Sequence, residues 1–272
     1  MKRSPPSFEA IHLRDTLIRE EVLENFRISM RPWPPVTMAL VIGIVLIHLT
    51  AVQLADDLTA YAVHPYTLQT FYPEWQGALM IFGARAPYEI TELHQYYRLL
   101  SCVFLHSDGM HLALNMIALF GLGRLCEAVY GASRFLWLFV FAGLCGSAAS
   151  MAGEASLAVG ASGSVFGLLG AGVVFGLRYR NELPRPLKRI FGRGLIPWVF
   201  LNILIGLNVP QIDNLGHMGG LFGGALLALW MGNRVIRDEQ GHFRNEQWMM
   251  AISVGLVAYT LLRMGQSIQT FL

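Results

Sequence analysis

The sequence predicts an all-α polytopic membrane protein, a bundle of seven transmembrane helices. Of its 272 residues, 54% are hydrophobic and 14% are charged, and the mean hydropathy is +0.47, whereas soluble domains carry about 25% charged residues. The apolar residues gather in seven segments of near-spanning length. The lysines and arginines concentrate in alternate loops between these segments, as expected for a chain that crosses a bilayer repeatedly.

Composition also excludes several classes of protein. The formal net charge of +2 is too small to suggest nucleic-acid binding, and no basic run is interleaved with aromatic residues. The three cysteines, Cys102, Cys126 and Cys145, are an odd number without metal-ligand spacing, so we expect neither a disulfide framework nor a zinc site. The first apolar run begins at Val36 and is too long for the core of a cleavable signal peptide.

The elements follow one another in a simple order. Residues 1–35 are polar with amphipathic spacing, which predicts a short cytoplasmic helix that can lie on the membrane surface. Seven apolar segments follow: Val36–Leu54, Met110–Val129, Phe135–Ala152, Gly160–Leu177, Gly194–Val209, Leu215–Met231 and Trp248–Leu262. The fifth and seventh are short for a spanning helix. We therefore divide the chain into an N-terminal segment (1–35), a six-helix core (36–231) and a cytoplasmic linker with a seventh helix (232–272).

The first loop of the core, residues 55–105, is unusually long. It is rich in tyrosine and tryptophan and ends near the apolar run LLSCVFL. Long connections inside compact domains are generally functional, and aromatic side chains favour the membrane interface. We expect a structured loop that is embedded in the membrane or lies at its surface.

The positive charges set the orientation of the bundle. With the N-terminus in the cytoplasm, only Arg85, Arg98 and Arg263 lie outside, and the other lysines and arginines lie inside. The C-terminus then lies outside, because the number of segments is odd. In this topology the second, fourth and sixth segments all run from the outer face inward.

Four polar side chains stand out within those three segments: His111, Asn115, Ser162 and His217. Polar groups in a membrane are costly and generally mark function. Each of the four lies near the start of its segment, so all share a shallow depth on the outer side. His111 and Asn115 are four residues apart and therefore share one helix face.

Glycines supply a means of bringing these side chains together. They recur four residues apart in the fourth and the sixth segment, in the pairs Gly163/Gly167 and Gly220/Gly224. Small residues at this spacing let helix backbones approach closely in lipid. The serine of the fourth segment can therefore come within reach of the histidine of the sixth.

Together these residue types suit acyl transfer. A serine becomes a nucleophile beside a general base, which is usually histidine, and asparagine and histidine side chains can stabilise the developing oxyanion. Ser162 at a helix N-terminus adds a free backbone N–H group. Because the pattern places no acid close enough to orient His217, a Ser–His dyad is favoured over a triad. Taken alone, Ser162 would more often be a packing residue or donate to a carbonyl of its own helix, and His217 would more often make an interhelical hydrogen bond, than take part in catalysis.

With these motifs the chain resembles the rhomboid family of intramembrane serine proteases, from Val36 to Met231. The family has Gly-x-Ser-Gly on the fourth span, His before GxxxG on the sixth, and His-x-x-x-Asn and Glu-x-x-x-Gly on the second. The matching residues are Gly160, Ser162 and Gly163; His217, Gly220 and Gly224; His111 and Asn115; and Glu127 and Gly131.

The resemblance implies a role for each of these residues. Ser162 would be the nucleophile and His217 the general base, and His111, Asn115 and the Ser162 backbone N–H would form the oxyanion hole. The residues expected to support the site are Gly160, Gly163, Phe166, Gly220 and Gly224, and those expected to be structural are Arg98, Glu127 and Gly131. The chain departs from the family at two points: Tyr97 precedes Arg98 where a tryptophan is usual, and Phe166 replaces a tyrosine that stacks on the histidine.

The sequence thus predicts a serine endopeptidase that cleaves transmembrane segments of membrane-anchored proteins near the outer face, with no metal or organic cofactor. The expected partners are single-span or multi-span membrane proteins and the lipid bilayer, and not nucleic acid. The expected location is a bacterial inner membrane with the site facing the periplasm, and a eukaryotic secretory membrane is the alternative.

Three other functions were weighed. A non-proteolytic relative that binds membrane proteins would typically lack the serine or the histidine, and this chain has both. A channel or transporter is disfavoured because the polar residues share one depth and do not line a path across the membrane. A soluble hydrolase with a G-x-S-x-G elbow would need glycine at position 164, where this chain has Ser164.

Overall fold

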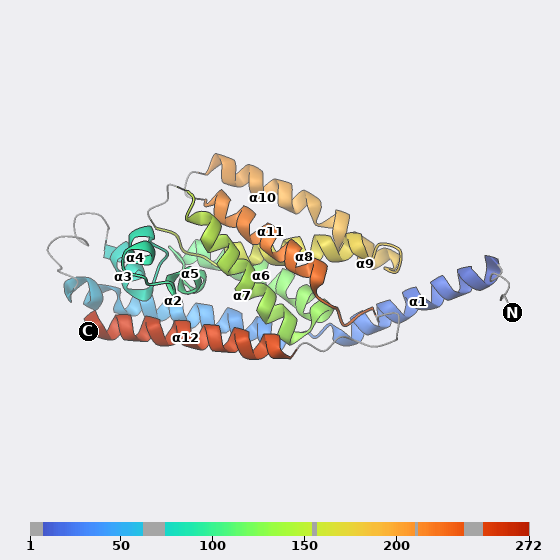
Figure 1. Cartoon of the computed structure of the whole chain (residues 1–272), viewed down its shortest axis with the longest axis horizontal. Helices are drawn as coiled ribbons and strands as arrows, with labels where there is room; N and C mark the ends of the chain where they lie inside the picture. Colours follow the sequence, from blue (N-terminus) through green and yellow to red (C-terminus); the bar gives the residue numbers. More distant parts are fainter. Residues whose placement is uncertain (1–7, 62–73, 154–156, 210–211, 237–246, 272) are drawn as a thin grey trace.

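The computed structural model describes residues 8–61, 74–153, 157–209, 212–236 and 247–271, and these residues fold into a helical bundle (Figure 1). The only β-type pairing among them is an isolated bridge between Arg85 and Ala158. The helices are α1 (Phe8–Ser29), α2 (Pro35–Tyr61), α3 (Glu74–Phe82), α4 (Pro87–Thr91), α5 (Arg98–Ser101), η1 (Cys102–Phe104), α6 (Gly109–Tyr130), α7 (Ala132–Ser150), α8 (Ser162–Arg178), α9 (Arg185–Ile190), η2 (Gly192–Gly194), α10 (Ile196–Asn208), α11 (Asn214–Trp230) and α12 (Trp248–Phe271).

The predicted class of fold, an all-α polytopic membrane bundle, is confirmed. Each of the seven predicted apolar segments is helical, in α2, α6, α7, α8, α10, α11 and α12. Among the described residues, five stretches are long and apolar enough to cross a membrane: Pro35–Ala55, Gly109–Tyr130, Ala132–Ser150, Arg185–Asn208 and Trp248–Thr270. The helices α8 and α11 have 17 residues each, the lower end of the length that spans a bilayer.

Two of the predicted boundaries were wrong by several residues. The seventh helix, α12, has 24 residues and continues to Phe271, beyond the predicted end at Leu262, because Met264 and Ile268 still pack against protein. The first helix, α2, continues to Tyr61, into the predicted loop. Both helices therefore continue beyond the point at which their sequences stop being apolar.

The centre of the bundle is the close contact of α8 with α11. A Cβ atom on Gly220 would collide with the carbonyl oxygen of Gly163, and one on Gly224 would collide with that of Gly167. The helix α7 joins the same centre, since a Cβ on Gly146 would lie 2.8 Å from the Gly216 carbonyl oxygen. The backbones thus touch without intervening side chains, as small residues permit in lipid.

The C-terminal end of α6 holds the start of α2. The buried Glu127 carboxylate accepts hydrogen bonds from the backbone N–H groups of Val36 (3.1 Å) and Thr37 (2.8 Å) and from the Thr37 hydroxyl (2.7 Å). It therefore satisfies N–H groups that a helix N-terminus leaves without intrahelical partners. Gly131, whose φ is +80°, makes the turn from α6 into α7.

The described part of the long first loop, residues 74–105, is folded; we call this segment the outer loop, after the side of the membrane predicted for it. The Arg98 guanidinium donates to the carbonyl oxygens of Met80 (2.8 Å) and Ala84 (3.0 Å) and to the Gln95 side chain (2.6 Å). The Ser101 hydroxyl donates to the carbonyl oxygen of Gly83. These hydrogen bonds tie the start of α5 to the end of α3, so the loop has its own small core beside the bundle.

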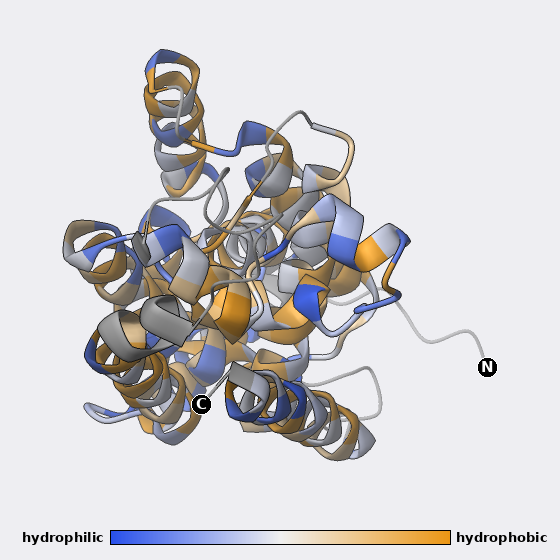
Figure 2. Cartoon of the chain, turned by 90° about the vertical axis from the view of Figure 1, so that its left-hand side faces the viewer, coloured by the Kyte–Doolittle hydropathy of each residue, from blue (hydrophilic) through white to orange (hydrophobic). Residues whose placement is uncertain are grey.

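The outer surface of the bundle is apolar, as a lipid-facing surface must be. Figure 2 shows hydrophobic residues along the helices around the bundle. Large exposed side chains occur on every side: Leu46, Leu49, Ile117, Trp198, Phe200, Leu204, Phe222, Leu226, Tyr259 and Leu262. In Figure 1, α10 and α12 lie on opposite sides of the central helices.

The α8–α11 contact predicts the effect of a single methyl group. Gly220→Ala should lower the free energy of unfolding by about 1–3 kcal/mol, because the added Cβ must push two backbones apart. Gly255→Ala on α12 is the matched control, since nothing lies within 4 Å of a Cβ there. Thermal unfolding in detergent measures both variants. Equal melting temperatures for the two would contradict the close contact.

Candidate active site

Ser162 is the first residue of α8, and a glycine shapes the backbone that leads to it. Gly160 has a φ of +127°, and a Cβ on it would lie 2.8 Å from the ring of His111. An L side chain meets both backbone strain and a steric clash there. Glycine therefore lets the chain turn into α8 while His111 of α6 lies directly against it.

Residues 157–161, before Ser162, are held by the outer loop. Arg85 and Ala158 exchange two backbone hydrogen bonds of 3.0 Å, and the Gly160 N–H donates to the Cys102 carbonyl oxygen at 2.9 Å. These three bonds satisfy backbone groups that no helix serves. The position of the Ser162 hydroxyl therefore depends on a loop that comes far earlier in the sequence.

His106 adds a further contact from the same loop. Its Nε2 accepts from the Ala161 N–H at 3.4 Å, and its ring centroid lies 5.1 Å from that of His111. Burial lowers the pKa of His106 to about 3, so the ring stays neutral and one nitrogen stays an acceptor. His106 therefore acts as a fixed support at neutral pH.

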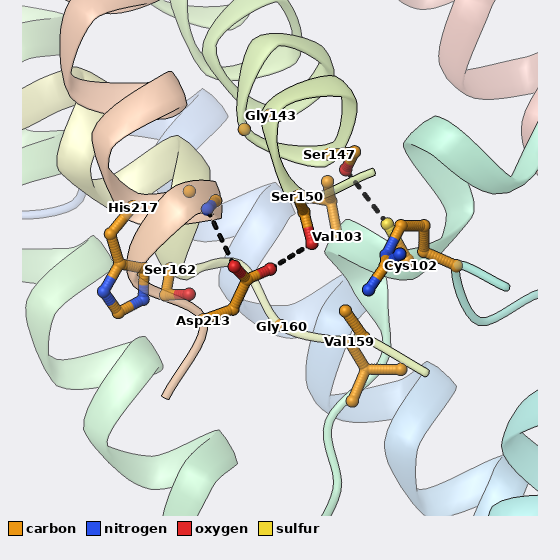
Figure 3. Close-up of a pocket in the computed structure, with 15 residues that line it drawn as sticks. Cys102, Val103, Gly143, Ser147, Ser150, Val159, Gly160, Ser162, Asp213 and His217 are labelled. Carbon is orange, nitrogen blue, oxygen red and sulfur yellow. Dashed lines mark hydrogen bonds between the residues drawn. The ribbon is translucent and has the colours of Figure 1, made fainter. Parts of the chain in front are cut away.

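His217 lies in the first turn of α11, beside the serine. Figure 3 shows the Ser162 and His217 side chains next to each other. The Phe166 ring stacks on this imidazole, with 4.2 Å between ring centroids and 15° between the planes. Phe166 is on α8, one turn after Ser162, so the two helices fix the serine and the histidine relative to each other.

A carboxylate lies near the histidine without bonding to it. Asp213 caps α11 by accepting from the Gly216 N–H at 2.9 Å, and its other oxygen accepts from the Ser150 hydroxyl. Both bonds are drawn in Figure 3. The His217 Nδ1 atom is buried and has no hydrogen-bond partner among the described residues. Asp213 therefore holds the start of α11 and does not orient the imidazole.

Ser162 and His217 line a common cavity of about 40 Å³. Its other polar lining residues are Arg85, Cys102, Ser147, Ser150 and Asp213. The volume suits a few water molecules or a small side chain. The Cys102 thiol is 3.1 Å from the Ser147 hydroxyl, and burial raises its pKa to about 11. The thiol therefore stays protonated and lies against Ser147, whereas Ser162 has a histidine beside it that can act as its base. Ser162 is the better candidate in this cavity.

Of the two predicted oxyanion-hole side chains, His111 lies close to the serine's segment, whereas Asn115 is bonded to its own helix. His111 lies against Gly160, and its Nδ1 is 3.0 Å from the Ser107 hydroxyl. Asn115 is buried on α6, and its amide donates to the His111 carbonyl oxygen at 2.9 Å. The structure thus brings His111 to the serine's segment, whereas the Asn115 amide is bonded to its own helix and does not line the cavity.

Sequence reasoning missed several residues around the serine. Asp213 carried a signal, because an aspartate before an apolar run typically caps a helix. Arg85, Cys102, His106 and Ser150 carried none, since their contacts join segments that are distant in sequence. Arg98, Glu127 and Gly131 lie away from the cavity lining. Within the described ranges, no group of three or more His, Cys, Asp or Glu side chains could hold a metal ion.

The fold and the site define a class: a polytopic helical membrane protein with a serine and a histidine that line one cavity. The model of the rhomboid domain matches residues 93–234. The chain belongs to the rhomboid family.

Named relatives agree with this assignment. The chain is 34% identical over 183 residues to "Rhomboid protease GluP" of Bacillus subtilis (67% of this chain, 35% of that protein). It is 33% identical over 199 residues to "RHOMBOID-like protein 1" of Arabidopsis thaliana (71% and 49%). It is 28% identical over 176 residues to "Rhomboid protease AarA" of Providencia stuartii (57% and 62%). The matches thus cover between about a third and three fifths of these relatives.

The bonds of Asp213 predict a stability difference between two helix caps. Asp213→Ala should lower the free energy of unfolding by about 2–3 kcal/mol, because it removes a cap and leaves the Ser150 hydroxyl without its acceptor. Asp108→Ala, at the exposed start of α6, is the matched control, and its cap is worth about 1 kcal/mol. Thermal unfolding measures both variants. An equal loss of unfolding free energy in both would mean that the hydrogen bond from Ser150 does not contribute to stability.

Proposed function

We propose that this protein is an intramembrane serine endopeptidase that cleaves transmembrane segments of membrane-anchored proteins by a Ser–His dyad. One observation carries the proposal: Ser162 and His217 lie side by side in the lining of one cavity, with Phe166 stacked on the imidazole. Membership of the rhomboid family and the names of two relatives as proteases support it.

The dyad would work in two stages. The imidazole nitrogen that faces Ser162 takes the hydroxyl proton while the serine oxygen attacks the scissile carbonyl carbon. His217 then gives this proton to the leaving amine, and an acyl-enzyme remains. In the second stage His217 takes a proton from a water molecule, whose oxygen attacks the acyl carbon. His217 then returns this proton to the serine oxygen as the ester bond breaks, which releases the acid product and restores the dyad.

The negative charge of each tetrahedral intermediate needs hydrogen-bond donors. The backbone N–H of Ser162 lies at the positive end of α8, and the His111 ring lies against Gly160. Asn115 would join them by exchanging its bond to the His111 carbonyl for one to the oxyanion. An amide already held one turn away can make this exchange by side-chain rotation.

The substrate would be a transmembrane helix that unwinds locally. A helical peptide bond is hydrogen-bonded and shielded by side chains, so cleavage favours residues that weaken helices. The cavity of about 40 Å³ favours a small side chain next to the bond. Entry from the lipid beside α10 agrees with the exposure of Trp198, Phe200 and Leu204 on that helix.

The site would face the outer side of the membrane. This orientation rests on the positive-inside pattern, which places the N-terminus in the cytoplasm. In the proposed division, residues 36–231 form the catalytic core between the N-terminal segment (1–35) and the region with the seventh helix (232–272). A bacterial inner membrane with the site toward the periplasm is the proposed location.

Cleavage of a labelled single-span membrane protein by the purified chain in detergent tests the function. Ser162→Ala and His217→Ala should abolish cleavage, because each removes one half of the dyad. Ser164→Ala is the matched control: the Ser164 hydroxyl donates to the Phe139 carbonyl oxygen at 2.8 Å, away from the cavity, and that variant should still cleave. Turnover by Ser162→Ala at the wild-type rate would refute the assignment of the nucleophile.

The role of Asn115 has its own test. Asn115→Ala should lower kcat about 100-fold or more if the amide donates to the oxyanion. Its melting temperature should stay close to that of the wild type, since the bond that it loses lies within one helix turn. An unchanged kcat would make Asn115 a purely structural residue.

A further inference from the structure

The seventh spanning helix, α12, packs against the protein along one continuous face. Its fully buried residues are Met249, Ser253, Thr260 and Met264, spaced four, seven and four apart, which places them on one side of a helix. The neighbouring residues Tyr259 and Leu262 are exposed. A helix that served only as a membrane anchor would not need such a face.

The outer half of this face completes the small core of the outer loop. Met264 is 4% exposed and belongs to a hydrophobic cluster separate from the main one, and Ile268 packs against the same cluster. The other buried members of the cluster come from α2 and the outer loop: Ala51, Leu79, Ile81, Phe82, Ala84, Tyr97 and Leu105. Without α12, this side of the loop core would be open to lipid.

One charged contact fixes the alignment of α12 and the loop. The Arg263 guanidinium carbon lies 5.5 Å from the centroid of the Tyr97 ring, and Tyr97 is only 6% exposed. A cation over an aromatic face is attracted more strongly where water is excluded. The Arg98 guanidinium of the outer loop lies over the same ring at 5.6 Å, so the Tyr97 ring contacts one cation from the loop and one from α12.

From Tyr97 a chain of direct contacts leads to the nucleophile. The next residue, Arg98, donates to the Ala84 carbonyl oxygen at 3.0 Å. The residue after Ala84 is Arg85, which exchanges two backbone hydrogen bonds with Ala158, four residues before Ser162. Each step is a packed or hydrogen-bonded contact, so displacement of Tyr97 can reach the backbone that presents the serine.

We propose that Arg263 is a positioning residue for catalysis: through Tyr97 it fixes the outer loop and thereby the backbone before Ser162. The inference rests on the proposed function and extends it to a helix beyond the family match, which ends at residue 234. Arg263 touches no reacting atom in this account. Its effect is to keep the loop, and with it residues 158–162, in one arrangement.

The test uses the whole chain with four variants. Arg263→Gln removes the cation, Arg263→Lys keeps it, Tyr97→Leu removes the ring, and Leu262→Ala is the control on the exposed face of α12. Two readouts are compared below the melting temperature of every variant: kcat and KM for the single-span substrate, and the rate at which N-ethylmaleimide alkylates Cys102. The Cys102 carbonyl holds Gly160 and its thiol lies in the cavity, so alkylation reports loosening of this contact.

Arg263→Gln should lower kcat and speed Cys102 alkylation, each up to about fivefold, the range that a cation–π contact with an exposed cation supplies. KM should change by less than about twofold, because the substrate does not contact Arg263. Arg263→Lys and Leu262→Ala should match the wild type. The alkylation rate of buried Cys126, which donates to the Leu168 carbonyl in the main core, should stay constant.

A double variant and two contrary outcomes complete the test. The double variant of Tyr97→Leu with Arg263→Gln should have the same kcat and Cys102 alkylation rate as Tyr97→Leu alone, because Arg263 acts only through the ring that Tyr97→Leu removes. An unchanged Cys102 rate or kcat in Arg263→Gln, even with a lower melting temperature, would overturn the positioning role. If the wild type cleaves nothing, the proposed function fails, and the Cys102 rates still decide whether α12 holds the loop.

Discussion

The structure depends on the direct backbone contact between α8 and α11. In lipid no hydrophobic force drives two apolar helices together, so close packing must supply the attraction. Glycines at 163, 167, 220 and 224 let carbonyl groups of one helix touch the other without side chains between them. Because Ser162 and His217 begin these same two helices, the contact that holds the bundle also sets the distance between serine and histidine.

A second constraint acts on the short segment before the serine. Residues 157–161 have no helix of their own, and the outer loop supplies partners for their backbone through Arg85, Cys102 and His106. Burial of polar backbone in a membrane protein requires such partners. The outer loop is therefore part of the site, and whatever holds this loop, including α12, bears on the geometry of the nucleophile.

The sequence was informative wherever periodicity or composition carried the information. Hydropathy located the seven apolar helices of the bundle. The predicted topology put Ser162 and His217 at one depth, and the structure has both side chains in the lining of one cavity. Glycine spacing indicated the close pair of helices. What the sequence could not provide were contacts between distant segments: the bond from Ser150 to Asp213, the bridge of Arg85 with Ala158, and the ring of Tyr97 under Arg263. The extra turns of α12 were missed because tertiary packing, not hydropathy, sets where that helix ends.

The most direct test of this account is to treat the purified wild-type chain with a fluorophosphonate and map the modified residue by mass spectrometry. Only a serine activated by a neighbouring base reacts readily. The account predicts one adduct, on Ser162, and none on Ser147, Ser150 or Ser164, which lie in the same part of the bundle. An adduct on another serine, or none under conditions that fully label a soluble serine protease, would contradict it.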